Sequence, residues 1–261
     1  MVDFVEAGSS GPLVVLIHSS VSGARMWRRL MEDLQDRFRV RAPNLIGYGR
    51  TPAWTADRPQ SLDDQARLVE AAIPSDADEV FLVGHSLGGA VAMKTAARLG
   101  GRVTRLVLIE PNLPYLLRET GREEAFAEAC SLRDSIKEAA ASGVWDEAAE
   151  TFADFWGGAG AWDALSSEKR AAFALALRPS VFEWDAVMGE TSPLDEWAAK
   201  LPRATLLISD PQTVLLIREL ASVLLAASPH WSHAAVPGAG HMAPLTRPDV
   251  INPIVGAFLR A

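Results

Sequence analysis

Residues 80–89 read VFLVGHSLGG, and this stretch decides the fold. Its first four residues form an apolar run, as expected of a strand that is buried on both faces. Residues 87–99 are rich in Ala, Leu, Val and Met and end at a pair of glycines, which predicts a helix. The glycines two positions before and after Ser86 allow a sharp strand-to-helix turn that leaves the serine hydroxyl exposed at the carboxyl edge of a sheet.

The alternation of strands and helices extends on both sides of this turn. Short apolar runs bounded by Gly, Pro or polar residues predict buried strands, and amphipathic stretches predict helices between them. One helix is expected to begin after Ser61, with Asp64 at the third helical position of a capping box. Because helical crossovers join parallel strands, we expect an α/β fold with a doubly wound, mostly parallel sheet. The other predicted strands are 13–17, 38–42, 106–109, 204–208 and 233–236, and the other helices are 25–35, 214–227 and 248–260.

The alternation stops at about residue 113. The residues that follow have the pattern of helices without convincing strands, and aromatic residues are frequent among them. We therefore expect one α/β domain, made of residues 1–112 and 201–261, that is interrupted by a helical insertion at 113–200.

The composition narrows the possible function classes. The formal net charge of −8 and the pI of about 5.2 disfavour binding to nucleic acid or to an anionic membrane. No apolar run approaches the ~20 residues of a membrane span, and the N-terminus lacks the pattern of a signal peptide. Cys130 is the only cysteine, so no internal disulfide is possible and a cytoplasmic location is expected. The sequence has no metal-ligand motif and no dinucleotide fingerprint, so neither a metal nor a cofactor is expected.

Four segments resemble, in chain order, those of the α/β-hydrolase fold family. Residues 18–20 (HSS) follow the first long strand, where the family usually has His-Gly-x. Residues 43–51 (PNLIGYGRT) resemble the family's Asp-x-x-Gly-x-Gly-x-Ser turn, with Asn44 in place of the aspartate. Residues 237–242 (PGAGHM) resemble the Gly-x-Gly-His segment that carries the family's catalytic histidine. With the turn around Ser86, the resemblance covers nearly the whole chain outside the insertion. It implies an α/β-hydrolase fold in which the insertion is a cap and Ser86 is the nucleophile.

The resemblance assigns the general base to His241. Of the five histidines, it alone matches both the family position and the chain order of serine, acid and histidine. His85 precedes the nucleophile, so its side chain should point away from that of Ser86. His18 lies where the family shapes the oxyanion loop, and we expect a structural or pocket role for it.

The acid of the triad is left open between two residues. The family usually places an aspartate after the strand that follows the insertion, but here Asp210 stands where a glycine is expected and Thr213 stands where the aspartate is expected. Glu110 ends the strand that follows the nucleophile helix, a position from which some relatives supply the acid. Its longer side chain would help it to reach the histidine. We favour Glu110 and keep Asp210 as the alternative.

The oxyanion hole needs backbone N–H donors. The resemblance implies Leu87, the residue after the nucleophile, and Ser20, with Ser19 as its neighbour. The substrate pocket is expected to be largely apolar and to be roofed by some of the aromatic residues of the insertion. Further candidates for its lining are His18, Tyr48, Met188 and Met242.

These residues predict acyl transfer to water on a small apolar carbonyl substrate, such as an ester, a thioester, a lactone or a carbon–carbon diketone. A serine nucleophile argues against the dehalogenase and epoxide hydrolase branches of the family, which use aspartate. Two alternatives stay open. One is a perhydrolase, a lyase or a carbon–carbon hydrolase with the same triad. The other is a ligand-binding protein or receptor without turnover, which the irregular position of the acid supports.

Overall fold

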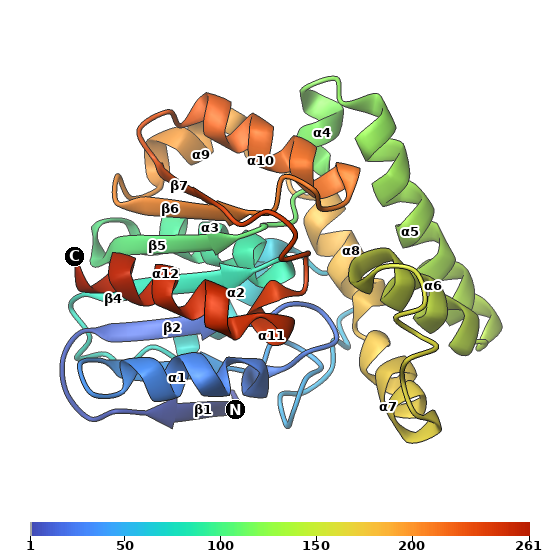
Figure 1. Cartoon of the computed structure of the whole chain (residues 1–261), viewed down its shortest axis with the longest axis horizontal. Helices are drawn as coiled ribbons and strands as arrows, with labels where there is room; N and C mark the ends of the chain where they lie inside the picture. Colours follow the sequence, from blue (N-terminus) through green and yellow to red (C-terminus); the bar gives the residue numbers. More distant parts are fainter. Residues whose placement is uncertain (1) are drawn as a thin grey trace.

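The computed structural model describes residues 2–261. Seven strands form one sheet: β1 (Phe4–Ala7), β2 (Leu13–Ile17), β3 (Arg39–Pro43), β4 (Val80–His85), β5 (Val103–Ile109), β6 (Thr205–Ser209) and β7 (Ser232–Ala235). Their order is β1-β3-β2-β4-β5-β6-β7 (Figure 1). β1 and β3 are antiparallel, and all other neighbouring strands are parallel. The predicted doubly wound, mostly parallel sheet is therefore confirmed.

Helices cover both faces of this sheet. One face carries α1 (Arg28–Leu34) and α12 (Pro248–Arg260), and the other carries α2 (Leu62–Ala71), α3 (Leu87–Leu99) and α10 (Leu215–Ala227). The capping box predicted at Ser61 and Asp64 is present at the start of α2. Three short helices complete this part of the chain: η1 (Ala24–Trp27), η2 (Gly100–Arg102) and α11 (Ala243–Thr246).

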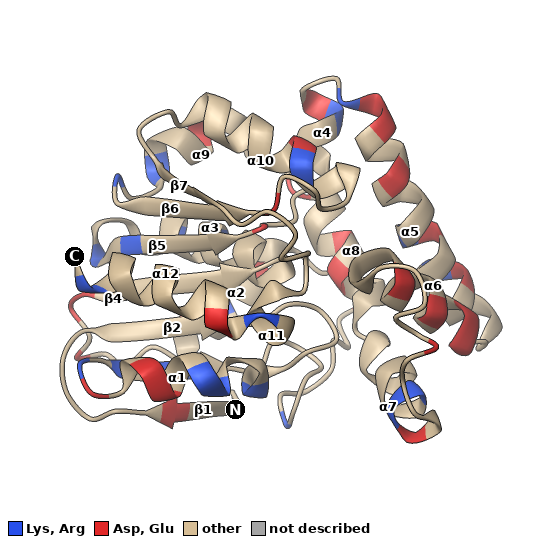
Figure 2. Cartoon of the chain, viewed as in Figure 1, with Lys and Arg blue, Asp and Glu red and all other residues tan. Residues whose placement is uncertain are grey.

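The strands have continuous apolar runs because both faces of the sheet are buried. Leu13, Val15 and Ile17 of β2 pack in the core on the side of α2, α3 and α10. Val14 and Leu16 pack in the core on the side of α1 and α12. Figure 2 shows that charged residues lie mainly on helices and loops, and β2 has none. Successive side chains of one strand thus contribute to two separate cores.

The edge strand β1 is not predicted from the sequence. Its residues are mostly exposed, and Phe4 and Val5 remain on the surface. Pairing with β3 holds it in place, and Arg41 of β3 both pairs with Glu6 and lies over the ring of Phe4. Because the strand depends on this pairing rather than on an apolar run, the local sequence carries little signal for it.

The chain between β5 and β6 consists of helices and loops, as expected for residues 113–200. Except for the last of them, which lies beside α10, these helices lie beyond the carboxyl ends of the parallel strands (Figure 1). Acidic residues follow the exposed side of the longest one (Figure 2). No helix within residues 2–261 combines the length and the apolar character needed to cross a bilayer. The helices of this insertion are α4 (Tyr115–Glu119), α5 (Glu123–Ser142), α6 (Asp146–Gly157), α7 (Ser167–Leu177), α8 (Ser180–Met188) and α9 (Leu194–Lys200).

The turn between β4 and α3 brings backbone segments into close contact. Ser86 has a φ of 54° and a ψ of −120°, which is an uncommon conformation for a residue with a side chain. A Cβ atom at Gly88 would lie 2.2 Å from the carbonyl oxygen of Ile17, and one at Gly84 would lie 2.2 Å from the carbonyl oxygen of Gly88. Both glycines are therefore needed for α3 to begin directly against β2 and β4.

Substitution of Gly88 by alanine should destabilise the protein. The new methyl group would overlap carbonyl oxygens that cannot move without shifting β2, so we expect the free energy of unfolding to fall by about 1–3 kcal/mol or more. Gly101→Ala is the matched control, because a Cβ atom there has no neighbour within 4 Å. The control should be neutral or stabilising by up to ~1 kcal/mol. Urea denaturation measures both, and equal stabilities of the two variants would contradict the packing described here.

His18 ties the end of β2 to the loop after β3. Its Nε2 atom accepts a hydrogen bond from the Leu45 N–H at 2.9 Å, so the proton is on Nδ1, which donates to the Ser19 carbonyl at 2.8 Å. Burial lowers the pKa of His18 to about 4, and the bond to Ser19 opposes this shift only in part. The ring is therefore neutral at physiological pH.

The neutral His18 should make the protein less stable in acid. Its pKa of about 4 in the folded state lies below its ordinary 6.5, so between these pH values the unfolded chain binds a proton that the folded chain does not. The free energy of unfolding should then fall with decreasing pH, by up to ~1.4 kcal/mol per pH unit for this residue. Urea unfolding at pH 7 and at pH 5 should give a smaller loss for His18→Gln than for the wild type. The exposed His230 gives the control, since His230→Gln should keep the wild-type loss.

Candidate active site

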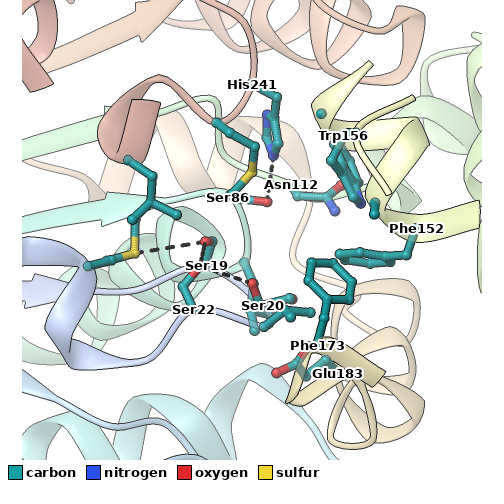
Figure 3. Close-up of a pocket in the computed structure, with 18 of the residues that line it drawn as sticks. Ser19, Ser20, Ser22, Ser86, Asn112, Phe152, Trp156, Phe173, Glu183 and His241 are labelled. Atoms are coloured by element: carbon teal, nitrogen blue, oxygen red, sulfur yellow. Dashed lines mark hydrogen bonds between the residues drawn. The ribbon is translucent and has the colours of Figure 1, made fainter. Parts of the chain in front are cut away.

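Ser86 and His241 meet at the carboxyl edge of the sheet (Figure 3). Ser86 lies in the turn between β4 and α3, and His241 lies in the loop between β7 and α11. The distance between Ser86 Oγ and His241 Nε2 is 3.0 Å, and both residues are buried. This distance is within hydrogen-bond reach, as required of a nucleophile and its base.

Glu110 is the acidic residue that contacts His241. It follows β5 with a φ of 45°, and its Oε2 atom lies 2.6 Å from His241 Nδ1. The carboxylate also accepts hydrogen bonds from the Asp210 N–H at 2.8 Å and from the Thr213 hydroxyl at 3.2 Å. Because Nδ1 donates to a carboxylate, the proton of neutral His241 is on Nδ1, and Nε2 is free to accept the proton of Ser86.

The carboxylate of Asp210 faces the backbone of the histidine loop instead of the imidazole. It accepts hydrogen bonds from the N–H groups of Gly238 at 3.1 Å, Gly240 at 2.7 Å and Gln212 at 2.8 Å. These donors compensate the burial of its charge, since Asp210 is only 2% exposed. Of the two candidate acids, the geometry thus favours Glu110, and Asp210 instead holds the loop that carries His241.

Two further rings lie next to that of His241. His85 Nε2 lies 2.8 Å from the carbonyl oxygen of His241. Burial and the neighbouring His241 lower the pKa of His85 well below its ordinary value, so its ring is neutral and donates to this carbonyl. Trp156 of α6 stacks on the ring of His241, with centroids 4.2 Å apart and an interplanar angle of 30°. The sequence pattern places Trp156 only among the aromatic residues of the insertion, and nothing in it indicates this contact.

The residues expected to supply the oxyanion donors, Ser20 and Leu87, line the same cavity as Ser86. Figure 3 shows Ser20 near Ser86. Leu87 is the first residue of α3, and neither its N–H nor that of Ser20 has a hydrogen-bond acceptor within residues 2–261. The next residue, Val21, has a φ of 66°, and its N–H donates to the Tyr48 hydroxyl at 2.9 Å. The Ser19 hydroxyl bonds to that of Ser22 at 2.8 Å, so its side chain stabilises the loop itself.

A cavity of about 460 Å³ opens onto Ser86 and His241. Most of its lining is apolar and comes from α6, α8 and the loops of the sheet domain, including the expected Leu87 and Met242. Aromatic residues of the insertion are part of this lining, as expected, together with polar side chains that the sequence did not single out. Three of them have a buried polar atom without a hydrogen-bond partner in the described chain: Asn112 (Oδ1), Trp156 (Nε1) and Glu183 (Oε1).

Three of the residues expected in the pocket lie outside its lining. Both ring nitrogens of His18 are occupied by the hydrogen bonds to backbone groups described above. Tyr48 packs edge-on against the His18 ring, with centroids 4.8 Å apart. Met188, at the end of α8, packs against the hydrophobic core, whereas Trp184 and Val187 of the same helix face the cavity. Residues adjacent on a helix point about 100° apart, so the rotation of α8 decides which side chain reaches the cavity.

Known proteins resemble this chain in sequence. Lipase LipV of Mycobacterium tuberculosis is 42% identical over 106 residues, which are 40% of this chain and 39% of that protein. Pimeloyl-(acyl-carrier protein) methyl ester esterase of Aromatoleum aromaticum is 39% identical over 107 residues, which are 41% of this chain and 40% of that protein. The chain thus spans less than half the length of these curated relatives.

Solved structures resemble the chain over its full length. A hydrolase from Pseudomonas aeruginosa PA01 matches with a TM-score of 0.78 at 20% identity, covering 99% of this chain and 94% of that one. The model of a family described as the alpha/beta hydrolase family matches residues 14–254. Because this match includes most of the sequence, the chain belongs to the alpha/beta hydrolase family.

Proposed function

We propose that the protein is a serine hydrolase that cleaves an ester or a related carbonyl substrate without a cofactor. The observation that carries the proposal is the continuous contact from Ser86 Oγ to His241 Nε2 at 3.0 Å and from His241 Nδ1 to Glu110 Oε2 at 2.6 Å. These are the contacts of a nucleophile, a general base and an orienting acid. They open onto a mostly apolar cavity that suits a small apolar substrate.

In the proposed reaction, Ser86 Oγ attacks the carbonyl carbon while His241 Nε2 takes the hydroxyl proton. The tetrahedral intermediate collapses when His241 returns this proton to the leaving alcohol, and the acyl group stays on Ser86. Water then attacks the acyl-enzyme and gives its proton to His241, which finally returns it to Ser86. The acid product leaves and the starting state is restored.

The negative oxygen of the intermediate needs donors that are already in place. The free N–H groups of Leu87 and Ser20 are our candidates, because both lie in residues that line the cavity beside Ser86. Glu110 holds the Nδ1 proton of His241 and stabilises the imidazolium that forms in each step.

The insertion at residues 113–200 is proposed to act as a cap on a core formed by residues 1–112 and 201–261. Its helices α6 and α8 contribute Phe152, Trp156 and Trp184 to the cavity wall. The similarity to a lipase and to a methyl ester esterase supports an ester as the substrate class.

A fluorophosphonate probe should test the nucleophile directly. It reacts with an activated serine, so wild-type protein should be labelled and Ser86→Ala should not. Ser135 lies on α5 away from the cavity, and Ser135→Ala should be labelled like the wild type. If the wild type stays unlabelled, the fold serves a ligand-binding function without turnover.

Substitutions of Glu110 and Asp210 should have different effects, mainly on catalysis for Glu110 and mainly on stability for Asp210. Glu110→Gln removes the partner of the Nδ1 proton and should lower kcat for a p-nitrophenyl ester by up to ~10⁴-fold, with little change in the KM. Asp210→Asn should cost less activity but should lower the free energy of unfolding by about 1–3 kcal/mol, because it disturbs buried bonds to backbone N–H groups. Ester hydrolysis and urea denaturation of both variants measure these effects. A larger kinetic loss in Asp210→Asn would assign the acid to that residue instead.

A further inference from the structure

Glu183 places a buried carboxyl group in the wall of the cavity (Figure 3). It belongs to α8 and is only 3% exposed. Its Oε2 atom accepts a hydrogen bond from the Ser180 hydroxyl at 3.0 Å, whereas its Oε1 atom has no hydrogen-bond partner in residues 2–261. Buried polar atoms in folded proteins nearly always have a partner. The unpaired oxygen of a residue that lines the cavity is therefore a candidate acceptor for a donor group of the ligand.

Among the described residues, the side chains that influence the pKa of Glu183 carry hydroxyl groups, and no cation pairs with its carboxyl group. Burial raises the pKa of its carboxyl, and the nearby hydroxyls of Ser20, Tyr48 and Ser180 lower it only in part. Asp185, two residues further along α8, has Lys137 at 2.7 Å, but no comparable charge stabilises Glu183. Although these hydroxyls lie near the carboxyl group, Oε1 itself makes no hydrogen bond within residues 2–261 and remains an unpaired acceptor.

Glu183 lies near the loop that contains one of the expected oxyanion donors. The Tyr48 hydroxyl beside it accepts the N–H of Val21, which follows the expected oxyanion donor Ser20. A molecule held at Glu183 Oε1 would therefore lie in the same cavity as Ser86 and close to the loop that would receive the substrate carbonyl. An isolated polar group in a mostly apolar pocket usually orients the ligand and selects it.

We propose that Glu183 is a specificity-determining residue whose Oε1 atom accepts a hydrogen bond from a hydroxyl or amino group of the substrate. This inference rests on the proposed ester hydrolysis at Ser86 and adds the substrate class to it. The preferred substrates are esters that carry one hydrogen-bond donor in an otherwise apolar acyl or alcohol group. A fully apolar ester of the same size fits the cavity but leaves Oε1 unpaired, and such a mismatch lowers the rate through weaker transition-state binding.

The test compares matched esters on the same protein samples. Methyl hexanoate is the apolar reference. The methyl esters of 3-hydroxy-, 6-hydroxy- and 6-aminohexanoic acid place a hydrogen-bond donor at different positions along the acyl chain. Hydroxybutyl hexanoate places the donor in the alcohol and is compared with pentyl hexanoate. The quantity measured is the kcat/KM of each donor ester divided by that of its apolar partner. This ratio does not change if part of a variant sample is unfolded.

For the donor ester that fits the site, we expect a ratio about 10- to 100-fold higher in the wild type than in Glu183→Leu. Glu183→Gln keeps an acceptor oxygen, so it should retain part of the preference for hydroxyl esters and lose it for the amino ester. Asp185→Asn changes a carboxylate on the same helix that does not line the cavity, and its ratios should equal those of the wild type.

Two failures are distinguishable. If wild-type protein hydrolyses none of these esters, with or without a donor, faster than Ser86→Ala does, the proposed function itself is wrong. If the apolar esters are hydrolysed but every ratio is the same in the wild type and in Glu183→Leu, Glu183 selects no donor and only this inference is overturned. A purely structural role of Glu183 gives the second result, because it lowers the kcat/KM of both partners equally.

Discussion

The close approach of α3 to β2 and β4 is the constraint on which the site depends. Gly88 has room for no side chain against the carbonyl oxygens of Ile17 and His18. This contact fixes the turn that carries the Ser86 hydroxyl, and it sets the start of the helix, where the N–H of Leu87 has no acceptor within residues 2–261. It also places the end of β2, and therefore the loop that contains Ser20, beside the same turn. One backbone packing contact thus positions the candidate nucleophile and both expected oxyanion donors.

The acid at the imidazole is held by residues from the loop where the family usually has its aspartate. The N–H of Asp210 and the hydroxyl of Thr213 both donate to Glu110, and the carboxylate of Asp210 secures the glycine-rich loop of His241. The carboxylate that contacts His241 therefore comes from a neighbouring strand of the sheet, while the loop after β6 keeps a supporting function. This arrangement explains why the sequence pattern left two acidic candidates, since both residues are part of one hydrogen-bonded unit.

Sequence patterns predicted the parts of the structure that depend on local signals. The apolar runs of the parallel strands and the capping box at Ser61 are of this kind, and so is the turn around Ser86. The edge strand β1 was missed because it depends on pairing with β3. The lining of the cavity was predicted only in part, because the rotation of a helix decides whether Met188 or Glu183 faces it. Such rotations result from packing between distant segments, which no local pattern specifies.

The stacking of Trp156 on His241 has a consequence for how this protein diversifies. The lining residues of α8 have no hydrogen bond or ring contact with His241 among the described residues, so a change there need not disturb the imidazole. The indole on α6 has no such freedom, because it is a wall of the cavity and a neighbour of the proton-transferring ring at the same time. Homologous proteins that act on different ligands should therefore vary more at positions 183–187 than at position 156.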